Sequence, residues 1–302
     1  MNRVPAAGSK ADRCSARWCV GWSSQALRAD PTHQGSGSPH YGDPALGLRP
    51  LGCWAAPLAA CLRAFHPLIP VIASGLRGAW QELVDLQPLA LPPGLAEIRG
   101  ELEGDAMAID NELKCCPGLR KMHLETAQVG ARLDILHCVL FPDPRYDLPL
   151  FGADVVAGPA GVSAAIVDLS PTGECLSPTL IEALEQLPQR PYKERREVPA
   201  WGSIFSKQVL FARLINAEEE AWFEADLLAF HRIFLQAVAA ATPEPAASDA
   251  VQQRWQQQQH YCAQQRRNDK TRRVLEVAFD PQWADNYIQN LLFDDPPQPC
   301  DP

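Results

Sequence analysis

Four strand-length segments joined by short connections limit what this chain can fold into more than any other feature. Glycine or proline separates the segments, which are RKMHLETA (residues 120–127), DILHCVLF (134–141), FGADVVA (151–157) and VSAAIVDL (162–169). Strands joined by such short connections pair antiparallel, because a parallel pair needs a crossover of about a dozen residues or more. Before them, alternation on both sides of Glu103-Gly104-Asp105 predicts a β-hairpin.

Helical patterns lie on both sides of the predicted strands. Apolar residues four apart predict a helix after Pro67, with one buried stripe made of Leu68, Ile72, Leu76 and Trp80. Asn216 and Glu219 predict a capping box for a long helix that continues to Phe234. A further helix is expected over residues 252–265, and Asp280-Pro281 begins the last one. This order predicts a single domain with one sheet covered by helices.

Charge and composition exclude several classes of protein. The 302 residues carry a net charge of −9, which argues against a general nucleic-acid binder. The longest apolar run, around residues 53–65, is interrupted by Pro57 and Arg63, so we expect no membrane span. The ten cysteines include no Cys-x-x-Cys pair, so we expect reduced thiols and a soluble, cytoplasmic protein.

Residues 1–63 differ from the remainder of the chain. They carry a net charge of +4, contain much Gly, Pro and Ser, and show no sustained period. We interpret them as a disordered N-terminal extension: a tail, a transit peptide, or a stretch ahead of the true start. Residues 64–302, with a net charge of −13, are expected to form the functional domain.

Polar side chains interrupt the predicted strands in a way that points to chemistry. Lys121, His123 and Glu125 share one face of their strand by the two-residue period. His137 and Asp154 lie among apolar neighbours on the following strands. Two histidines and two carboxylates that converge on one pocket would shift each other's pKa values and suit proton transfer.

Three interpretations of this cluster remain open from the pattern alone. In the first, His123 is exposed and His137 is a core histidine whose hydrogen bonds are satisfied. In the second, two histidines and a carboxylate bind a metal such as non-haem iron. In the third, the cluster is a metal-free acid–base site for an organic substrate.

Two long stretches resemble a known family. LRKMHLETAQVGARLDILHCVLFPDPRYDLPLFGADVVAGPAGVSAAIVDLSP and HYCAQQRRNDKTRRVLEVAFDPQWADNYIQNLLFD are similar to the ferredoxin-dependent bilin reductases. The resemblance covers roughly residues 64–302. It implies an α/β fold, a three-layer α/β/α sandwich whose central antiparallel sheet is flanked by helices, with the bilin between the sheet and the C-terminal helices.

The resemblance also implies the chemistry and its residues. Family members bind no metal or flavin, and single electrons come from an external reduced [2Fe–2S] ferredoxin. Asp154 matches the aspartate that shares a proton with the lactam oxygens of the bilin, and His137 matches its partner. Glu125 matches the glutamate tied to reduction of the D-ring vinyl group, and His123 a second histidine of the proton relay.

Cationic and polar positions match the substrate clamp of the family. Ser163, Arg196 and Lys270 fall where the propionates bind, with Asn268 and Thr271 close by. The basic run that includes Lys270 also predicts a docking patch for acidic ferredoxin, because the net charge of the whole protein opposes that association. The docking candidates are Arg266, Arg267, Arg272 and Arg273. A solvated helix face is the alternative for these arginines.

The expected function is therefore four-electron reduction of biliverdin IXα to phycocyanobilin by ferredoxin, D-ring vinyl group first and A-ring second, through bilin radicals. Glu125 together with His137 favours phycocyanobilin, because relatives that form phycoerythrobilin depart from this pair. The alternatives are a reductase with a different product such as phycoerythrobilin, a non-catalytic bilin carrier, or a metal-dependent enzyme. We expect a monomer.

Overall fold

The computed structural model of this chain describes residues 63–198, 202–267 and 269–301. The interpretation of residues 1–63 as a disordered extension therefore lies outside the described residues, except for Arg63, whose guanidinium lies 2.9 Å from the Asp134 carboxylate.

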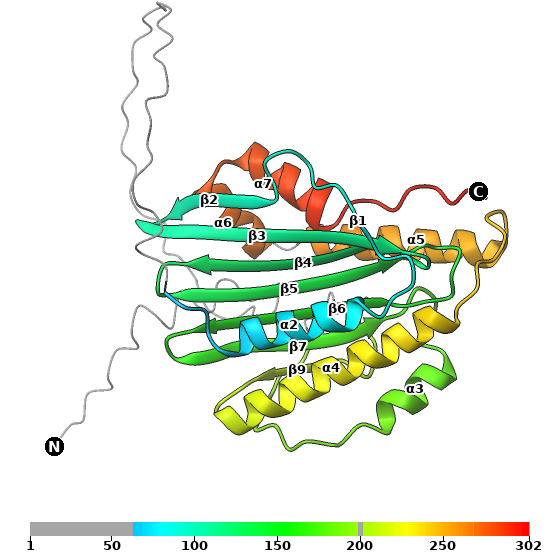
Figure 1. Cartoon of the computed structure of the whole chain (residues 1–302), viewed down its shortest axis with the longest axis horizontal. Helices are drawn as coiled ribbons and strands as arrows, with labels where there is room; N and C mark the ends of the chain where they lie inside the picture. The colour runs from blue at the N-terminus through cyan, green and yellow to red at the C-terminus, as the bar shows by residue number, and fades with distance from the viewer. Residues whose placement is uncertain (1–62, 199–201, 268, 302) are drawn as a thin grey trace, which may run out of the picture.

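One large antiparallel sheet forms the centre of the molecule (Figure 1). Within the described ranges it has nine strands in the order β1-β3-β4-β5-β6-β7-β9-β8, and β2 also pairs with β3. Their bounds are β1 Gln87–Pro88, β2 Glu97–Leu102, β3 Asp105–Cys116, β4 Leu119–Val129, β5 Leu133–Pro142, β6 Leu150–Gly158, β7 Gly161–Ser170, β8 Glu194–Arg195 and β9 Leu210–Arg213. The four predicted strands and their antiparallel pairing are confirmed.

The predicted hairpin joins β2 and β3 through a two-residue turn. Leu102 pairs with Asp105, and Glu103 and Gly104 between them have φ angles of 52° and 86°. Two successive positive φ angles define a type I′ turn, whose twist matches that of the flanking strands. Glycine suits the second position because it has no Cβ to clash there.

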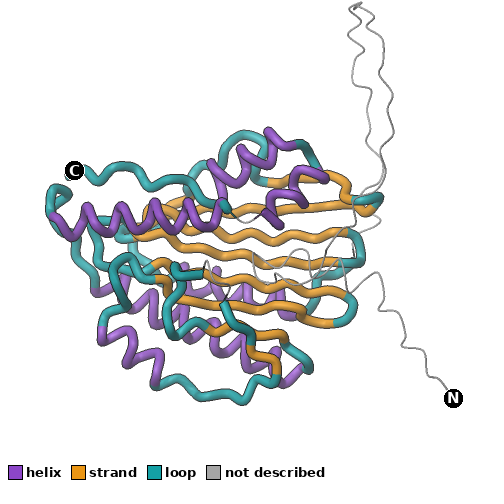
Figure 2. Tube along the Cα trace, turned by 180° about the vertical axis from the view of Figure 1, so that it is seen from behind, coloured by secondary structure: helices purple, strands orange, loops and turns teal. Residues whose placement is uncertain are grey.

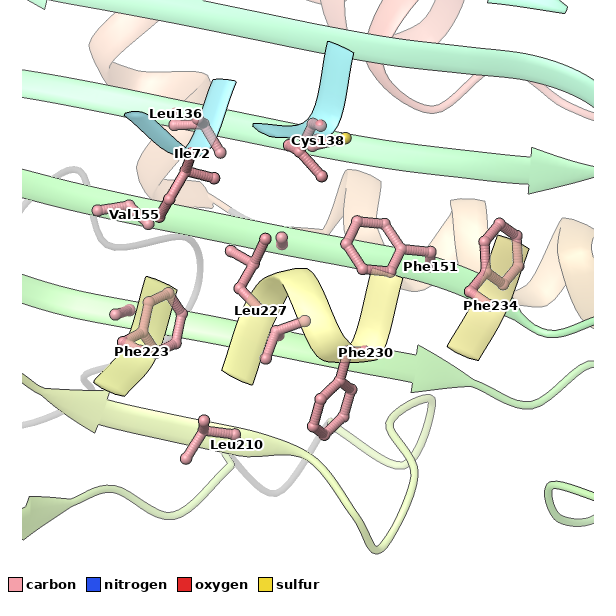
Figure 3. Close-up of a cluster of buried hydrophobic side chains, with 14 of the residues drawn as sticks. Ile72, Leu136, Cys138, Phe151, Val155, Leu210, Phe223, Leu227, Phe230 and Phe234 are labelled. Atoms are coloured by element: carbon pink, nitrogen blue, oxygen red, sulfur yellow. The ribbon is translucent and has the colours of Figure 1, made fainter. Parts of the chain in front are cut away.

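Helices α2 (Leu68–Trp80), α3 (Pro178–Glu185) and α4 (Ala217–Ala240) form the layer in front of the sheet in Figure 1. The stripe predicted after Pro67 is buried, as expected. Figure 3 shows how side chains of β5 and β6 meet Ile72 of α2 and the apolar face of α4, including Phe223 and Leu227. Each such side chain contributes roughly 1.5–3 kcal/mol on burial, so this layer anchors the sheet.

Helices α5 (Asp249–Arg266), α6 (Asp269–Ala278) and α7 (Pro281–Tyr287) and the π-helix η2 (Ile288–Leu292) cover the other face (Figure 2). A second apolar cluster lies beneath them and includes Ile135 and Val139 of β5 with Tyr287 and Ile288. The α/β/α sandwich is thus confirmed.

The capping box predicted for α4 is half correct. Asn216 Oδ1 accepts a hydrogen bond from the backbone N–H of Glu219 at 2.9 Å. The Glu219 carboxylate, however, accepts from the backbone N–H groups of Ile215 and Lys193, so it ties the helix start to two neighbouring segments. The helices expected over residues 252–265 and after Asp280 are confirmed as α5 and α7. No helix of the described ranges has the length and apolarity to cross a membrane.

Candidate active site

A row of polar side chains crosses four neighbouring strands on the face covered by α5–α7. Asn111 of β3 lies opposite Glu125 of β4, Glu125 opposite His137 of β5, and His137 opposite Asp154 of β6. Directly opposed residues in an antiparallel sheet project from the same face and lie close together. His123 lies two residues before Glu125 and therefore on the same face. The sheet register thus brings together all four residues that the sequence predicted to be catalytic.

His137 and Asp154 form the shortest polar contact between the strands of this row, with 2.6 Å between Nδ1 and Oδ1. Burial opposes a charge on His137, but the Asp154 carboxylate outweighs it and raises the pKa of the imidazole. The pair can therefore hold a proton in a buried place and release it when a nearby group becomes more basic.

Glu125 is buried and contacts the covering helix. The Tyr287 hydroxyl of α7 lies 2.6 Å from Glu125 Oε2 and 3.0 Å from Asn111 Oδ1. Burial raises the pKa of Glu125, although His137 and the Tyr287 hydrogen bond oppose the change. A carboxyl group with a raised pKa can serve as a proton donor near neutral pH.

His123 is fully buried, with 0% of its surface exposed, so the interpretation of an exposed His123 is wrong. Its Nε2 atom lies 2.8 Å from Asn111 Oδ1, and its ring centroid is 5.8 Å from that of His137. Burial, with the nearby charges of His137 and Lys121, holds the pKa of His123 well below its usual value. The two histidines therefore differ: His123 favours the neutral form and His137 the charged form.

Two buried histidine ring nitrogens in the site make no hydrogen bond to another described residue. Among the residues that the structure describes, His123 Nδ1 and His137 Nε2 have no hydrogen-bond partner. Buried polar atoms are normally paired, and exceptions often belong to functional sites. Within the described ranges, His137 therefore makes its hydrogen bond through Nδ1 alone, to Asp154.

The C-terminal segment closes over this face. The Phe293 ring meets His137 edge-on at 5.8 Å between centroids. Lys121 Nζ donates to the carbonyl oxygens of Leu291 at 2.8 Å and Leu292 at 3.3 Å, and it also pairs with Asp294. Burial lowers the pKa of Lys121 to about 8. Lys121, on the same face as His123, thus fastens the cover over the acid–base row.

The predicted substrate-binding residues are spread over several elements. Ser163 on β7 donates to the Val156 carbonyl at 3.1 Å. Arg196 follows β8, and its guanidinium lies 5.6 Å from the centre of the Phe211 ring. Phe211 faces Ile166, which faces Asp154, so Arg196 lies at the end of the same row. Lys270 and Thr271 belong to α6, and Asn268 lies outside the described residues.

The predicted docking arginines fall into two groups. Arg266 donates to the Phe293 carbonyl at 2.8 Å and pairs with Asp295, and Arg272 pairs with Asp285. These two therefore hold the C-terminal segment. Arg267 and Arg273 are exposed.

Sequence reasoning missed Asn111 and Tyr287. Asn111 interrupts the alternating series Met107, Ile109 and Leu113 on β3, and that interruption was a usable signal. Tyr287 gave no comparable signal, because only the packing of α7 brings it to Glu125.

The described part of the chain contains no group of three or more His, Cys, Asp or Glu side chains arranged to hold a metal ion. In the row itself, the candidate nitrogens and carboxylates contact each other, Asn111 and Tyr287.

A largely buried acid–base row under a helical cover suits proton transfer to a bound organic molecule, and comparison with known proteins identifies the class. The family model of the ferredoxin-dependent bilin reductases matches residues 73–294. The chain belongs to this family and is an oxidoreductase.

Its similarity to individual proteins is close. It is 50% identical over 234 residues to the phycocyanobilin:ferredoxin oxidoreductase of Synechococcus sp. (strain CC9902), covering 78% of this chain and 95% of that protein. It is 51% identical over 234 residues to the enzyme of the same name from Prochlorococcus marinus (strain MIT 9303), covering 78% and 89%. The crystal structure of tomato phytochromobilin synthase in complex with biliverdin has the same fold, with a TM-score of 0.61 and 15% identity over 74% of this chain and 82% of that one.

Proposed function

We propose that this protein reduces biliverdin IXα to phycocyanobilin with electrons from reduced [2Fe–2S] ferredoxin. The D-ring vinyl group is reduced first and the A-ring second. The observation that carries the proposal is the pair formed by buried His137 and partly buried Asp154, 2.6 Å apart, directly beside Glu125 in one row. The names of the similar cyanobacterial proteins and the biliverdin in the tomato structure support it.

Proton supply is the task that this row suits. The full reaction adds four electrons and four protons to the bilin. Each electron places negative charge on the conjugated system, and a nearby acid neutralises that charge by protonation. Asp154 with His137 donates protons in the lactam region of the bilin, and Glu125 donates a proton to the D-ring vinyl group. His123 takes part in returning protons to these groups between steps. The bilin radicals form one electron at a time, so the relay must accept new protons between steps.

Substrate binding needs an apolar slot and cations. The face that carries the row is lined with apolar residues such as Ile135, Val139 and Ile166, which suit a flat tetrapyrrole. We assign the propionates to Ser163, Arg196 and Lys270, with Asn268 and Thr271 beside them. The position of Arg196 at the end of the row supports this assignment. No bound metal or flavin takes part in the proposed reaction.

Ferredoxin docks, in this proposal, on the basic surface around α6. Arg267 and Arg273 are the exposed candidates, and Arg266 and Arg272 support the same surface from within their ion pairs. We place the enzyme in the cytoplasm as a monomer.

Anaerobic incubation with biliverdin and reduced ferredoxin, followed by chromatography of the bilins, tests the proposal. Phycocyanobilin is the expected product. Phycoerythrobilin would overturn the product assignment, and recovery of unchanged biliverdin from a stable complex would indicate a carrier. Elemental analysis of the purified protein decides the metal-dependent alternative.

A further inference from the structure

The side-chain amide of Asn111 joins three groups of the site. Its Nδ2 donates to the Leu95 carbonyl oxygen at 2.8 Å. Its Oδ1 lies 2.8 Å from His123 Nε2 and 3.0 Å from the Tyr287 hydroxyl oxygen. Asn111 is thus the point at which β3, β4 and α7 meet.

The chemistry of these groups fixes where the hydrogens are. A backbone carbonyl oxygen only accepts, so the Asn111 atom beside Leu95 must be the nitrogen. The oxygen of the amide then faces His123, and an amide oxygen also only accepts. His123 Nε2 must therefore carry a hydrogen to make its 2.8 Å contact.

We propose that Asn111 is a positioning residue that holds His123 in the tautomer with hydrogen on Nε2, which leaves Nδ1 as the unprotonated nitrogen. Any proton that His123 takes up or gives away then sits on Nδ1. This inference deepens the proposed function, because it names the atom through which His123 enters the relay.

The surroundings of His123 agree with this assignment. Its Nδ1 is buried and has no hydrogen-bond partner in the described part of the chain, so nothing there competes for a proton. Burial keeps the pKa of the ring low, so the neutral ring prevails near pH 8.

Tyr287 connects this tautomer to Glu125. A protonated Glu125 donates to the Tyr287 oxygen, and the Tyr287 hydroxyl then donates to Asn111 Oδ1. An ionised Glu125 instead accepts from Tyr287, and Asn111 Oδ1 keeps only the His123 hydrogen bond. Asn111 therefore holds the tautomer in both states of Glu125.

The test is nitrogen–proton correlation NMR at pH 8 on the full chain with ¹⁵N-labelled histidine, which distinguishes the two tautomers and the charged ring. Loss of one of the seven histidine patterns in His123→Gln assigns the signal. The wild type should show the Nε2–H tautomer, and Asn111→Leu should lose it in favour of a mixture that contains Nδ1–H. Asn290→Leu, the same change at an exposed position, should leave the His123 signal unchanged.

An Nδ1–H tautomer or a doubly protonated His123 in the wild type would overturn the proposal, as would a pure Nε2–H tautomer in Asn111→Leu. If Asn111→Leu does not fold, the nearly isosteric Asn111→Asp replaces it, and a carboxylate beside Nε2 should convert His123 to the doubly protonated form. The doubly protonated ring and the Nε2–H tautomer both keep hydrogen on Nε2, so an Nδ1–H tautomer in Asn111→Asp would contradict the proposal.

A kinetic measurement adds a second readout. Asn111→Leu should lower kcat by about 10- to 100-fold with little change in KM for the bilin, because a general acid–base group contributes about 10²–10⁴-fold in total. The NMR measurement needs neither biliverdin nor ferredoxin. Failure of the tautomer assignment is therefore distinguishable from failure of the proposed reaction.

Discussion

His137 and Asp154 face each other across β5 and β6 with 2.6 Å between Nδ1 and Oδ1. Two rigid neighbouring strands hold this contact, so its geometry depends on sheet register rather than on loop conformation. Such a placement lets a proton sit at the same point in each reduction step.

Asp154→Asn should bind biliverdin and fail to reduce it. The amide keeps the shape of the side chain but cannot serve as an acid, so we expect kcat to fall by about 10²- to 10⁴-fold. Absorption titration measures binding, and product chromatography measures turnover. Asp226→Asn is the matched control, because Asp226 is also a carboxylate with little exposed surface but lies on α4, on the other side of the sheet. Near-normal turnover by Asp154→Asn would remove Asp154 from the role of proton donor.

Glu125→Gln should stop reduction of the D-ring vinyl group and change the pH dependence of stability. The folded-state pKa of Glu125 is raised, so ionisation destabilises the fold as pH rises above the ordinary value of 4.5. The neutral amide avoids this cost. The free energy of unfolding of the variant should therefore rise relative to that of the wild type between pH 5 and pH 8.

Urea unfolding of both proteins at pH 5 and pH 8 checks the stability effect of Glu125→Gln. The gap between the two free energies of unfolding should widen toward pH 8, and an equal gap at both values would contradict the raised pKa. Recovery of ordinary phycocyanobilin from the variant would remove Glu125 from D-ring reduction.

Tyr287→Phe should lower both stability and activity. It removes the hydroxyl between Glu125 and Asn111 and leaves the ring stacked on Trp283, at 5.0 Å between centroids. Loss of a buried hydrogen bond costs about 1–3 kcal/mol. Tyr192→Phe removes a similar buried hydroxyl, 2.7 Å from Asp226, on the opposite face of the sheet. The two variants should lose a similar free energy of unfolding, and only Tyr287→Phe should slow turnover. Equal turnover by the two variants would show that the Tyr287 hydroxyl has only a structural role.

Arg267→Glu with Arg273→Glu should raise KM for ferredoxin several-fold and weaken its dependence on salt. Both arginines are exposed, so the change acts on association rather than on folding. Arg232→Glu on α4 changes an exposed arginine on the other face and serves as the control. Steady-state rates at two ionic strengths are the measurement. A change in KM for ferredoxin no larger than that caused by Arg232→Glu would show that ferredoxin does not dock at Arg267 and Arg273.

Most of the fold could be predicted because its signals are local. Alternation, Gly and Pro punctuation, and the Glu103-Gly104 turn define the strands and their pairing without reference to distant residues. The second partner of the Glu219 carboxylate could not be predicted, because Lys193 reaches it only in the folded chain.

The part of the site that lies on the strands could be predicted from the sequence. Period two and the strand order place His123, Glu125, His137 and Asp154 on one face. Tyr287, Phe293 and the contacts of Lys121 with Leu291 and Leu292 depend on how the last helices pack. The burial that lowers the pKa of His123 comes from that packing, whereas the Asp154 carboxylate that raises the pKa of His137 is placed opposite it by the sheet register.

The arrangement of the two helical layers has a consequence for the order in which the protein is made. The sheet and the helices α2, α3 and α4 all precede residue 241, whereas the cover of the acid–base row comes from α5 onward. During synthesis, a chain that has emerged from the ribosome as far as α4 can complete one core while the other face of the sheet is still open to water. The cover of the acid–base row is therefore the last part of the molecule to be made, and until it is made the apolar side chains of the second cluster lie open to water.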